Sequence, residues 1–209
     1  MTQANMKLIV VSAPGFFPGE TSLINKLFEV GLSCLHLRKP LSSESDFNHF
    51  LSQIEPVFLS RIAIHQHHVY ATDYGIKRLH FPENDRLQMS ESGINKLVHQ
   101  GYTLSTSIHN LSETSQLSEG FAYTFYGPVF NSISKPGYQG IISNDFCFEN
   151  PMKKIKVIGL GGIQMNNLLR AMKMNFDGLG LLGAIWQDLP RAVDNFTSIQ
   201  KAIHHTHDR

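Results

Sequence analysis

The chain has 209 residues, 42% of them hydrophobic, and no Pro-, Gly- or Ser-rich linker or low-complexity block divides it, so residues 1–209 are expected to form one α/β domain. Its 18 basic and 17 acidic side chains leave a formal charge of +1 and no basic stripe, which argues against nucleic-acid binding. Cys34 and Cys147 match no CxxC spacing, which argues against a disulfide framework or a structural zinc site and favours a reducing, cytoplasmic location.

The N-terminal segment is expected to be a first strand. It carries one lysine before a four-residue apolar run, LIVV, which is too short for a signal sequence or a membrane span. The sequence therefore predicts no membrane partner.

Short apolar runs alternate along the chain with stretches of helical spacing. The clearest helical stretches are 23–30, 167–174 and 196–203, where apolar residues recur at i, i+3 or i+4. This βα repetition predicts a single compact (β/α)₈ TIM barrel in preference to a doubly wound sheet, which would normally need fewer strands. The eight expected strands are Lys7–Val11, Cys34–Leu37, Ile62–Ile64, Arg78–Phe81, Thr103–Ser107, Ala122–Tyr126, Lys156–Gly159 and Gly178–Leu182.

The segment KVIGLGGI carries the strongest local signal. A strand runs directly into Gly161 and Gly162, and a helical pattern opens at Met165. Uncovered backbone N–H groups at such a turn suit an anionic oxygen group, and phosphate commonly binds after the seventh and eighth strands of a TIM barrel. The alternative is a tight turn that needs glycine only for its backbone angles.

Polar side chains also end the second and third strands. Alternation places His36 and Arg38 on one inward face near the barrel mouth, where Arg38 is expected to clamp a phosphate or diphosphate; its alternative is a surface ion pair. His65 or His36 is a candidate general acid or base, because imidazole titrates near neutral pH. A zinc site on His65, His67 and His80 is the less favoured hypothesis, because no carboxylate or cysteine is fixed at ligand spacing.

Two later loops extend this rim. Ser107 ends the fifth strand and is a candidate ligand contact, whereas Asn110 is better explained as a helix cap. The sixth strand leads into a long loop with Ser132, Ser134 and Lys135, whose hydroxyls and ammonium suit a diphosphate beneath a lid. An ordinary flexible loop is the alternative.

In order along the chain, these motifs resemble the thiamine phosphate synthase and TenI family, whose members are single (β/α)₈ barrels. HLRKP, IHQHHVYATDYGIKRLHFPENDR, TSIHNLSE, FYGPVFNSISK and VIGLGGIQMNN with FDGLGLLGAI each resemble a family motif, and together they span nearly the whole chain. The synthase joins a hydroxymethylpyrimidine diphosphate to a hydroxyethylthiazole phosphate and releases diphosphate. The expected partners are therefore phosphorylated thiazole and pyrimidine molecules, while homo-oligomerisation stays open.

The resemblance assigns roles to individual positions. Arg38, Ser107, Ser132, Ser134 and Lys135 correspond to diphosphate and lid contacts, and Lys135 joins His36, Arg38 and His65 as a candidate catalytic residue. Asp85 corresponds to the remaining carboxylate of an Mg²⁺ site. The thiazole phosphate cup corresponds to Gly161, Gly162, Leu182 and Gly183.

Departures from the motifs leave three functions open. His36 replaces the synthase's glutamine, Pro40 replaces a lysine beside Lys39, and His65-Gln66 replaces an Asn-Asp pair, so one Mg²⁺ carboxylate is missing. TenI enzymes aromatise a thiazole carboxylate phosphate by metal-free proton transfer, yet Pro128 stands where their histidine would be, and His36 or His65 would have to replace it. The alternatives to the synthase are this tautomerase and a catalytically silent binder; another phosphate-binding barrel enzyme would leave the NSISK sequence unexplained.

Overall fold

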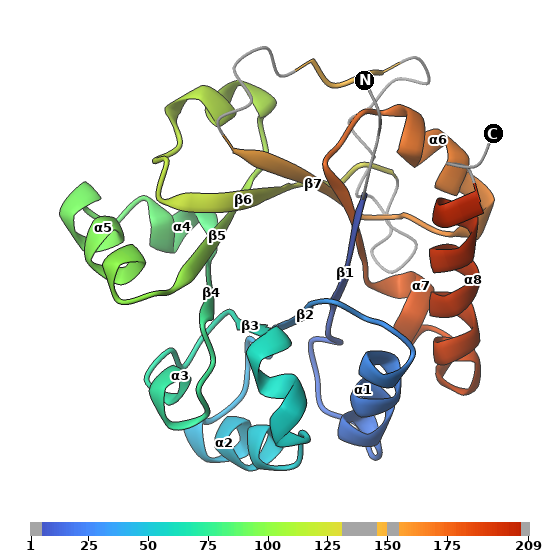
Figure 1. Cartoon of the computed structure of the whole chain (residues 1–209), viewed down its shortest axis with the longest axis horizontal. Coiled ribbons are helices and arrows are strands. Elements are labelled where there is room, and N and C mark those ends of the chain that lie inside the picture. Colours follow the sequence, from blue (N-terminus) through green and yellow to red (C-terminus); the bar gives the residue numbers. More distant parts are fainter. Residues whose placement is uncertain (1–5, 131–145, 150–154, 206–209) are drawn as a thin grey trace.

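A computed structural model describes residues 6–130, 146–149 and 155–205, and these residues fold as a closed parallel barrel wrapped by helices. Each strand pairs with its neighbours in chain order, and β1 closes the ring against β8 (Figure 1). The single (β/α)₈ barrel predicted from the sequence is therefore confirmed. The strands are β1 (Lys7–Val11), β2 (Leu35–Leu37), β3 (Ile62–Ile64), β4 (Arg78–Phe81), β5 (Thr103–Ile108), β6 (Phe121–Tyr126), β7 (Lys156–Leu160) and β8 (Gly178–Leu181).

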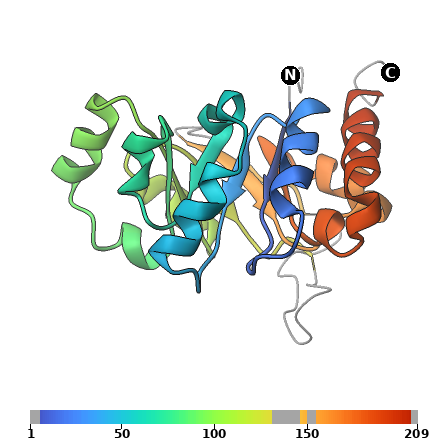
Figure 2. The same cartoon turned by 90° about the horizontal axis from the view of Figure 1, so that it is seen from below.

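Helices follow the strands and form the outer layer, as the view in Figure 2 shows. The connection from β5 to β6 carries the 3₁₀ helix η2 (Leu111–Gln116). Its N-cap residue is Asn110, whose side chain accepts a hydrogen bond from the Ser112 N–H (3.0 Å). The cap predicted at Asn110 is thus confirmed. The α-helices are α1 (Glu20–Glu29), α2 (Glu44–Ser52), α3 (Tyr70–Asp73), α4 (Glu83–Arg86), α5 (Glu91–His99), α6 (Leu168–Lys173), α7 (Gly183–Trp186) and α8 (Ala192–His205); the other 3₁₀ helices are η1 (Pro56–Arg61), η3 (Met165–Asn167) and η4 (Leu189–Arg191).

Strand alternation divides the core into two regions. Outward side chains such as Leu8, Val10 and Leu104 pack against the helices. Inward side chains fill the barrel, where Ile9, Val11 and several other apolar residues form a smaller cluster. Unusually for a barrel interior, which is normally dominated by branched aliphatic residues, polar groups from β2, β4 and β5 also point inward at His36, His80 and Ser105.

A buried ion pair holds the loop between β1 and α1 in place. Lys39 Nζ lies 2.6 Å from Glu20 Oε1, both side chains are 1% exposed, and the ammonium also donates to the carbonyl oxygens of Ala13 and Gly15. Lys39 thus has a structural role. Its place in the sequence, next to Arg38, did not indicate this role.

The chain carries no membrane-spanning candidate in the part that the structure describes: none of its helices there is both long and apolar enough to cross a bilayer.

Candidate active site

A pocket opens at the carboxyl ends of the strands, where TIM barrels place their functional residues. It has a volume of about 450 Å³ and is lined by residues that follow most of the strands. The predicted site residues that line it are Arg38, His65, Ser107, Gly161, Gly162, Leu182 and Gly183. The sequence-derived set is therefore brought together in space, with the exceptions described below.

One end of the pocket presents unpaired backbone N–H groups. Gly161 and Gly162 have φ values of +105° and +66°, so the turn after β7 needs glycine for its backbone conformation. The N–H groups of Gly162 and Ile163, and those of Gly183 and Ala184 at the start of α7, donate no hydrogen bond to any residue in the described segments. Four residues that line the same cavity thus keep an N–H group without a partner in the described segments, an arrangement that suits a phosphate.

Asn167 fixes this glycine turn. Its Nδ2 donates to the Gly162 carbonyl oxygen (2.8 Å), and its Oδ1 accepts from the Gln164 N–H (2.8 Å). One side chain therefore holds both sides of the turn and leaves the intervening N–H groups for a ligand. The sequence analysis missed this role; the Gln164-to-Asn167 spacing of a capping box was the available signal.

Arg38 supplies a positive charge at the pocket. Its backbone is held by Ser12, whose hydroxyl accepts from the Arg38 N–H (2.9 Å) and donates to the Arg38 carbonyl oxygen (3.1 Å). Its guanidinium forms no ion pair with any carboxylate of the described chain. This geometry favours the clamp interpretation over the surface ion pair.

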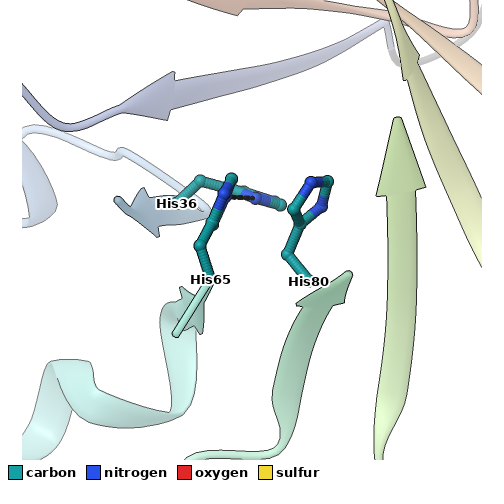
Figure 3. A group of neighbouring side chains, drawn as sticks. All are labelled: His36, His65 and His80. Carbon is teal, nitrogen blue, oxygen red and sulfur yellow. Dashed lines mark hydrogen bonds between the residues drawn. The ribbon is translucent and has the colours of Figure 1, made fainter. Parts of the chain in front are cut away.

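Three histidines lie together, from β2, from the end of β3 and from β4 (Figure 3), and two of them, His65 and His80, line the pocket. His36 is fully buried and donates to, or accepts from, two partners: its Nδ1 lies 2.9 Å from His65 Nε2, and its Nε2 lies 2.6 Å from the Tyr123 hydroxyl. His36 is absent from the pocket lining, so any catalytic role it has must act through another residue. His65 and His80 both neighbour His36 and line the pocket, and His65 is the one that shares a hydrogen bond with it.

His80 lies between two serines. Its Nδ1 lies 3.0 Å from Ser105 Oγ, and its Nε2 lies 3.0 Å from Ser107 Oγ. A hydroxyl can donate or accept, so both serines can pair with either neutral tautomer of His80. Ser107, which lines the pocket, is therefore held in place by His80.

Burial keeps these imidazoles neutral. Loss of hydration is the largest cause that lowers the pKa of His36 and of His65 well below 6.5, and it lowers the pKa of His80 to about 3. Burial also raises the pKa of the Tyr123 hydroxyl far above its usual range. At neutral pH each of these imidazole rings therefore has one nitrogen that donates a hydrogen bond and one that can accept a hydrogen bond or a proton.

Among the described residues, the same three imidazoles are the sole cluster of three potential metal ligands, with candidate atoms within 4.8 Å of one another. Two ligands each about 2.1 Å from zinc lie at most about 4.2 Å apart. The His65 and His80 rings also stack, with centroids 3.9 Å apart and planes at 26°, so their in-plane lone pairs diverge. The cluster is better described as a hydrogen-bonded network than as a metal site.

His67 takes no part in this cluster, contrary to the zinc hypothesis. It adopts a positive φ of 53°, and its Nε2 lies 3.2 Å from both the carbonyl oxygen and the hydroxyl of Ser42. The chain turns at His67, so its ring points away from His80, while His36, from another strand, takes the place that sequence proximity assigned to His67.

The predicted magnesium ligand lies elsewhere. Asp85 is exposed on α4 and does not line the pocket, although Glu83 from the same helix does, with its carboxylate 3.7 Å from Arg86 and 3.8 Å from His109. Gln66 stands where a second carboxylate was expected, and its buried Nε2, a donor that cannot bind a cation, has no hydrogen-bond partner among the described residues. The described side chains do not fit a carboxylate-held Mg²⁺. Ser132, Ser134 and Lys135 lie outside the described residues.

Comparison with known proteins identifies the family. The family model described as thiamine monophosphate synthase matches residues 8–185. The chain belongs to this family. Among solved structures, a thiamine phosphate pyrophosphorylase from Bacteroides thetaiotaomicron aligns with a TM-score of 0.72 and 26% identity over 94% of this chain and 96% of that one.

Two further structures share the fold at lower identity. A thiamine phosphate pyrophosphorylase from Pyrococcus furiosus has a TM-score of 0.73 and 14% identity over 98% of this chain and 97% of that one. A phosphoribosyl anthranilate isomerase from Thermus thermophilus has a TM-score of 0.59 and 10% identity over 95% and 100%. No curated protein sequence matches this chain.

Proposed function

We propose that this member of the thiamine monophosphate synthase family binds a thiazole phosphate and aromatises a thiazole carboxylate phosphate by proton transfer, with His65 as the group that carries the proton. The observation that carries the proposal is the pocket itself: unpaired N–H groups at Gly162, Ile163, Gly183 and Ala184 occupy one end, and the neutral imidazole of His65 lines the same cavity.

The phosphate end is supported by charge and geometry. Four N–H donors offer hydrogen bonds to phosphate oxygens, and the guanidinium of Arg38 can neutralise negative charge without giving up an existing ion pair. Binding of this kind holds the heterocycle at a fixed depth in the barrel. A heterocycle held in this way lies in the same cavity as His65, so the proposal needs no conformational change to bring the two together.

The chemistry is an isomerisation, so atoms balance without a co-reactant. A proton leaves the saturated ring carbon of the substrate for His65, the electron pair of the broken C–H bond enters the π system of the ring, and the proton is delivered to a carbon outside the ring as the aromatic thiazole forms. Neutral imidazole is suited to both steps. Pro128, which stands at the position of the family's tautomerase histidine, also lines the pocket but has no group that moves a proton.

Thiamine phosphate synthesis is the second candidate. It is favoured by the NSISK sequence, whose Ser132, Ser134 and Lys135 resemble the diphosphate contacts of the synthase, and by the 26% identity to a protein named as a thiamine phosphate pyrophosphorylase. This reaction requires Mg²⁺ by family resemblance, with Asp85 as the predicted ligand. The neutral Gln66 and the position of Asp85 weigh against it.

One pair of assays separates the candidates. The first follows aromatisation of the thiazole carboxylate phosphate by NMR with a chelator present; the second follows thiamine phosphate formation from hydroxymethylpyrimidine diphosphate, hydroxyethylthiazole phosphate and Mg²⁺. We expect metal-free turnover in the first assay, lost in His65→Asn and retained in His204→Asn, which alters an exposed histidine on α8.

Turnover in the second assay alone would assign the synthase reaction. Binding of thiazole phosphate without turnover in either assay would identify a silent binder. Full aromatisation by His65→Asn would remove His65 from the mechanism, whatever the overall reaction.

A further inference from the structure

We propose that His36 and Tyr123 are positioning residues that control which nitrogen of His65 carries its proton, and so whether His65 offers the pocket a proton acceptor or a proton donor. This inference rests on the proposed proton transfer at His65. It concerns a buried chain of three side chains, Tyr123, His36 and His65, of which Tyr123 lies outside the segments that resemble family motifs.

The chain is defined by two short contacts. His65 Nε2 lies 2.9 Å from His36 Nδ1, and His36 Nε2 lies 2.6 Å from the Tyr123 hydroxyl. Exposure of the three side chains is 9%, 0% and 5% in the order His65, His36, Tyr123, so water does not compete along the chain. His65 Nδ1 makes no hydrogen bond to a described residue, which leaves it as the nitrogen that serves the pocket.

Neutral imidazoles allow two proton arrangements in this chain. In the first, Tyr123 donates to His36 Nε2, His36 Nδ1–H donates to His65 Nε2, and His65 carries its own proton on Nδ1. In the second, His65 Nε2–H donates to His36 Nδ1, His36 Nε2–H donates to the Tyr123 oxygen, and His65 Nδ1 is a lone pair. Each arrangement uses both contacts, because a hydroxyl can donate or accept.

Only the second arrangement makes His65 a base. When it takes a proton from the substrate at Nδ1, His65 becomes an imidazolium whose Nε2–H already points at His36, which shares the charge. His36 in turn holds its Nε2–H against the Tyr123 oxygen. The proton then returns from Nδ1 to the substrate, and the chain ends as it began.

The buried surroundings explain why Tyr123 can serve this purpose. Cys34 and Ser105 lie near its hydroxyl and influence its pKa. When the hydroxyl oxygen accepts from His36, its own proton can therefore be directed toward one of these two side chains. No carboxylate belongs to the cluster, and the nearby charged groups that act on it are Arg38 from the loop after β2 and Arg78 from β4. A hydroxyl has both a proton and lone pairs, so Tyr123 supports both arrangements at its end of the chain.

Tyr123→Phe tests the inference, with Tyr126→Phe as its matched control. Both tyrosines lie on β6 and are buried, but Tyr123 points into the barrel and Tyr126 packs toward the helices. Phenylalanine presents a positive ring edge to His36 Nε2, which favours a lone pair there and disfavours an N–H. The variant should therefore hold His65 in the tautomer protonated at Nδ1.

Nitrogen NMR of ¹⁵N-histidine-labelled protein without substrate reads the tautomer directly. We expect His65 to populate the Nε2–H form in the wild type and in Tyr126→Phe, and to shift to the Nδ1–H form in Tyr123→Phe. Unchanged His65 tautomer populations in Tyr123→Phe would overturn the inference. So would stoichiometric zinc in the purified wild-type protein, because a metal ion would occupy the same lone pairs.

Kinetics supply the second readout. Tyr123→Phe should lower kcat for aromatisation by about tenfold or more while KM changes by less than about twofold, since the hydroxyl touches no substrate. An unchanged kcat together with a shifted tautomer would also overturn the positioning role. If the wild type aromatises nothing, the proposed function fails, and the NMR result still decides whether the chain sets the tautomer.

Discussion

Three neutral histidines in the barrel interior make stability depend on pH. His36, His65 and His80 have folded-state pKa values below 6.5, the last at about 3, so below pH 6.5 the unfolded chain binds more protons than the folded one. The sign follows directly: their contribution is fully present above about pH 6.5 and is lost as pH falls below that value. Each neutral histidine can add a slope of up to about 1.4 kcal/mol per pH unit.

We therefore predict a steep loss of the free energy of unfolding between pH 6.5 and pH 5, measured by urea denaturation. His80→Gln should reduce the slope, because the titration of one buried histidine is gone while those of His36, His65 and the less buried His68 remain. His204→Gln, at an exposed site, should leave it unchanged. A free energy of unfolding that is constant over this range would mean that the histidines titrate in the folded protein.

At the same scale, the chain shows how far single residues can be interpreted from sequence. Arg38 and Ser107 both line the pocket, and for Arg38 the alternation along β2 indicated the side of the strand on which the pocket lies. His36 was expected at the barrel mouth but lies one layer deeper, because alternation gives the face and not the depth. The link from His36 to Tyr123 joins β2 to β6, and no local pattern could predict a contact between positions so far apart in the chain.

At the scale of elements, the turn after β7 is the part of the site that sequence specified best. A strand, two glycines and a helix start are local features, and the structure confirms all three, with η3 beginning at Met165 as expected. Expected and observed strand bounds differ by one residue or not at all. Helix bounds differ more, because α1 begins at Glu20, before the apolar periodicity that marked it.

Asn167 should govern phosphate binding through this turn. Asn167→Ala removes the bonds to the Gly162 carbonyl oxygen and the Gln164 N–H, so the N–H groups between them lose their fixed direction. We expect Kd for the thiazole phosphate to rise by about tenfold, the effect of roughly one to two hydrogen bonds, in isothermal titration calorimetry. Asn166→Ala, at the exposed neighbouring position, is the control. Equal Kd values for the two variants would show that the turn holds its shape unaided.

At the scale of the whole molecule, closure of the barrel depends on very close contact at β8. β8 pairs with β1 through four residues, from Lys7 opposite Gly178 to Val10 opposite Leu181, and it also pairs with β7. A closed barrel leaves no free strand edge, so a displacement of β8 from β1 disturbs the hydrogen bonding of the whole ring of strands. The eight-strand number and order were predictable from the βα repetition, whereas this closeness was not, because a glycine in a strand does not reveal what approaches it.

Gly178 is where that closeness can be tested. A Cβ placed there would meet the Lys7 carbonyl oxygen at 2.5 Å and Ile158 Cδ1 at 2.8 Å, so Gly178→Ala must push β1 and β7 away from β8. Overpacking of this kind costs about 1–3 kcal/mol, which lowers Tm by roughly 2–12 °C in a chain of this size. Gly15→Ala, where a Cβ would meet nothing within 4 Å, should have little effect on Tm.

Trp186, the single tryptophan, donates to the Val11 carbonyl oxygen (2.6 Å) and so reports on β1. Because closure couples all strands, its fluorescence and the circular dichroism of the backbone should shift together in Gly178→Ala; a shift in fluorescence alone would mean that β1 separates without unfolding the barrel.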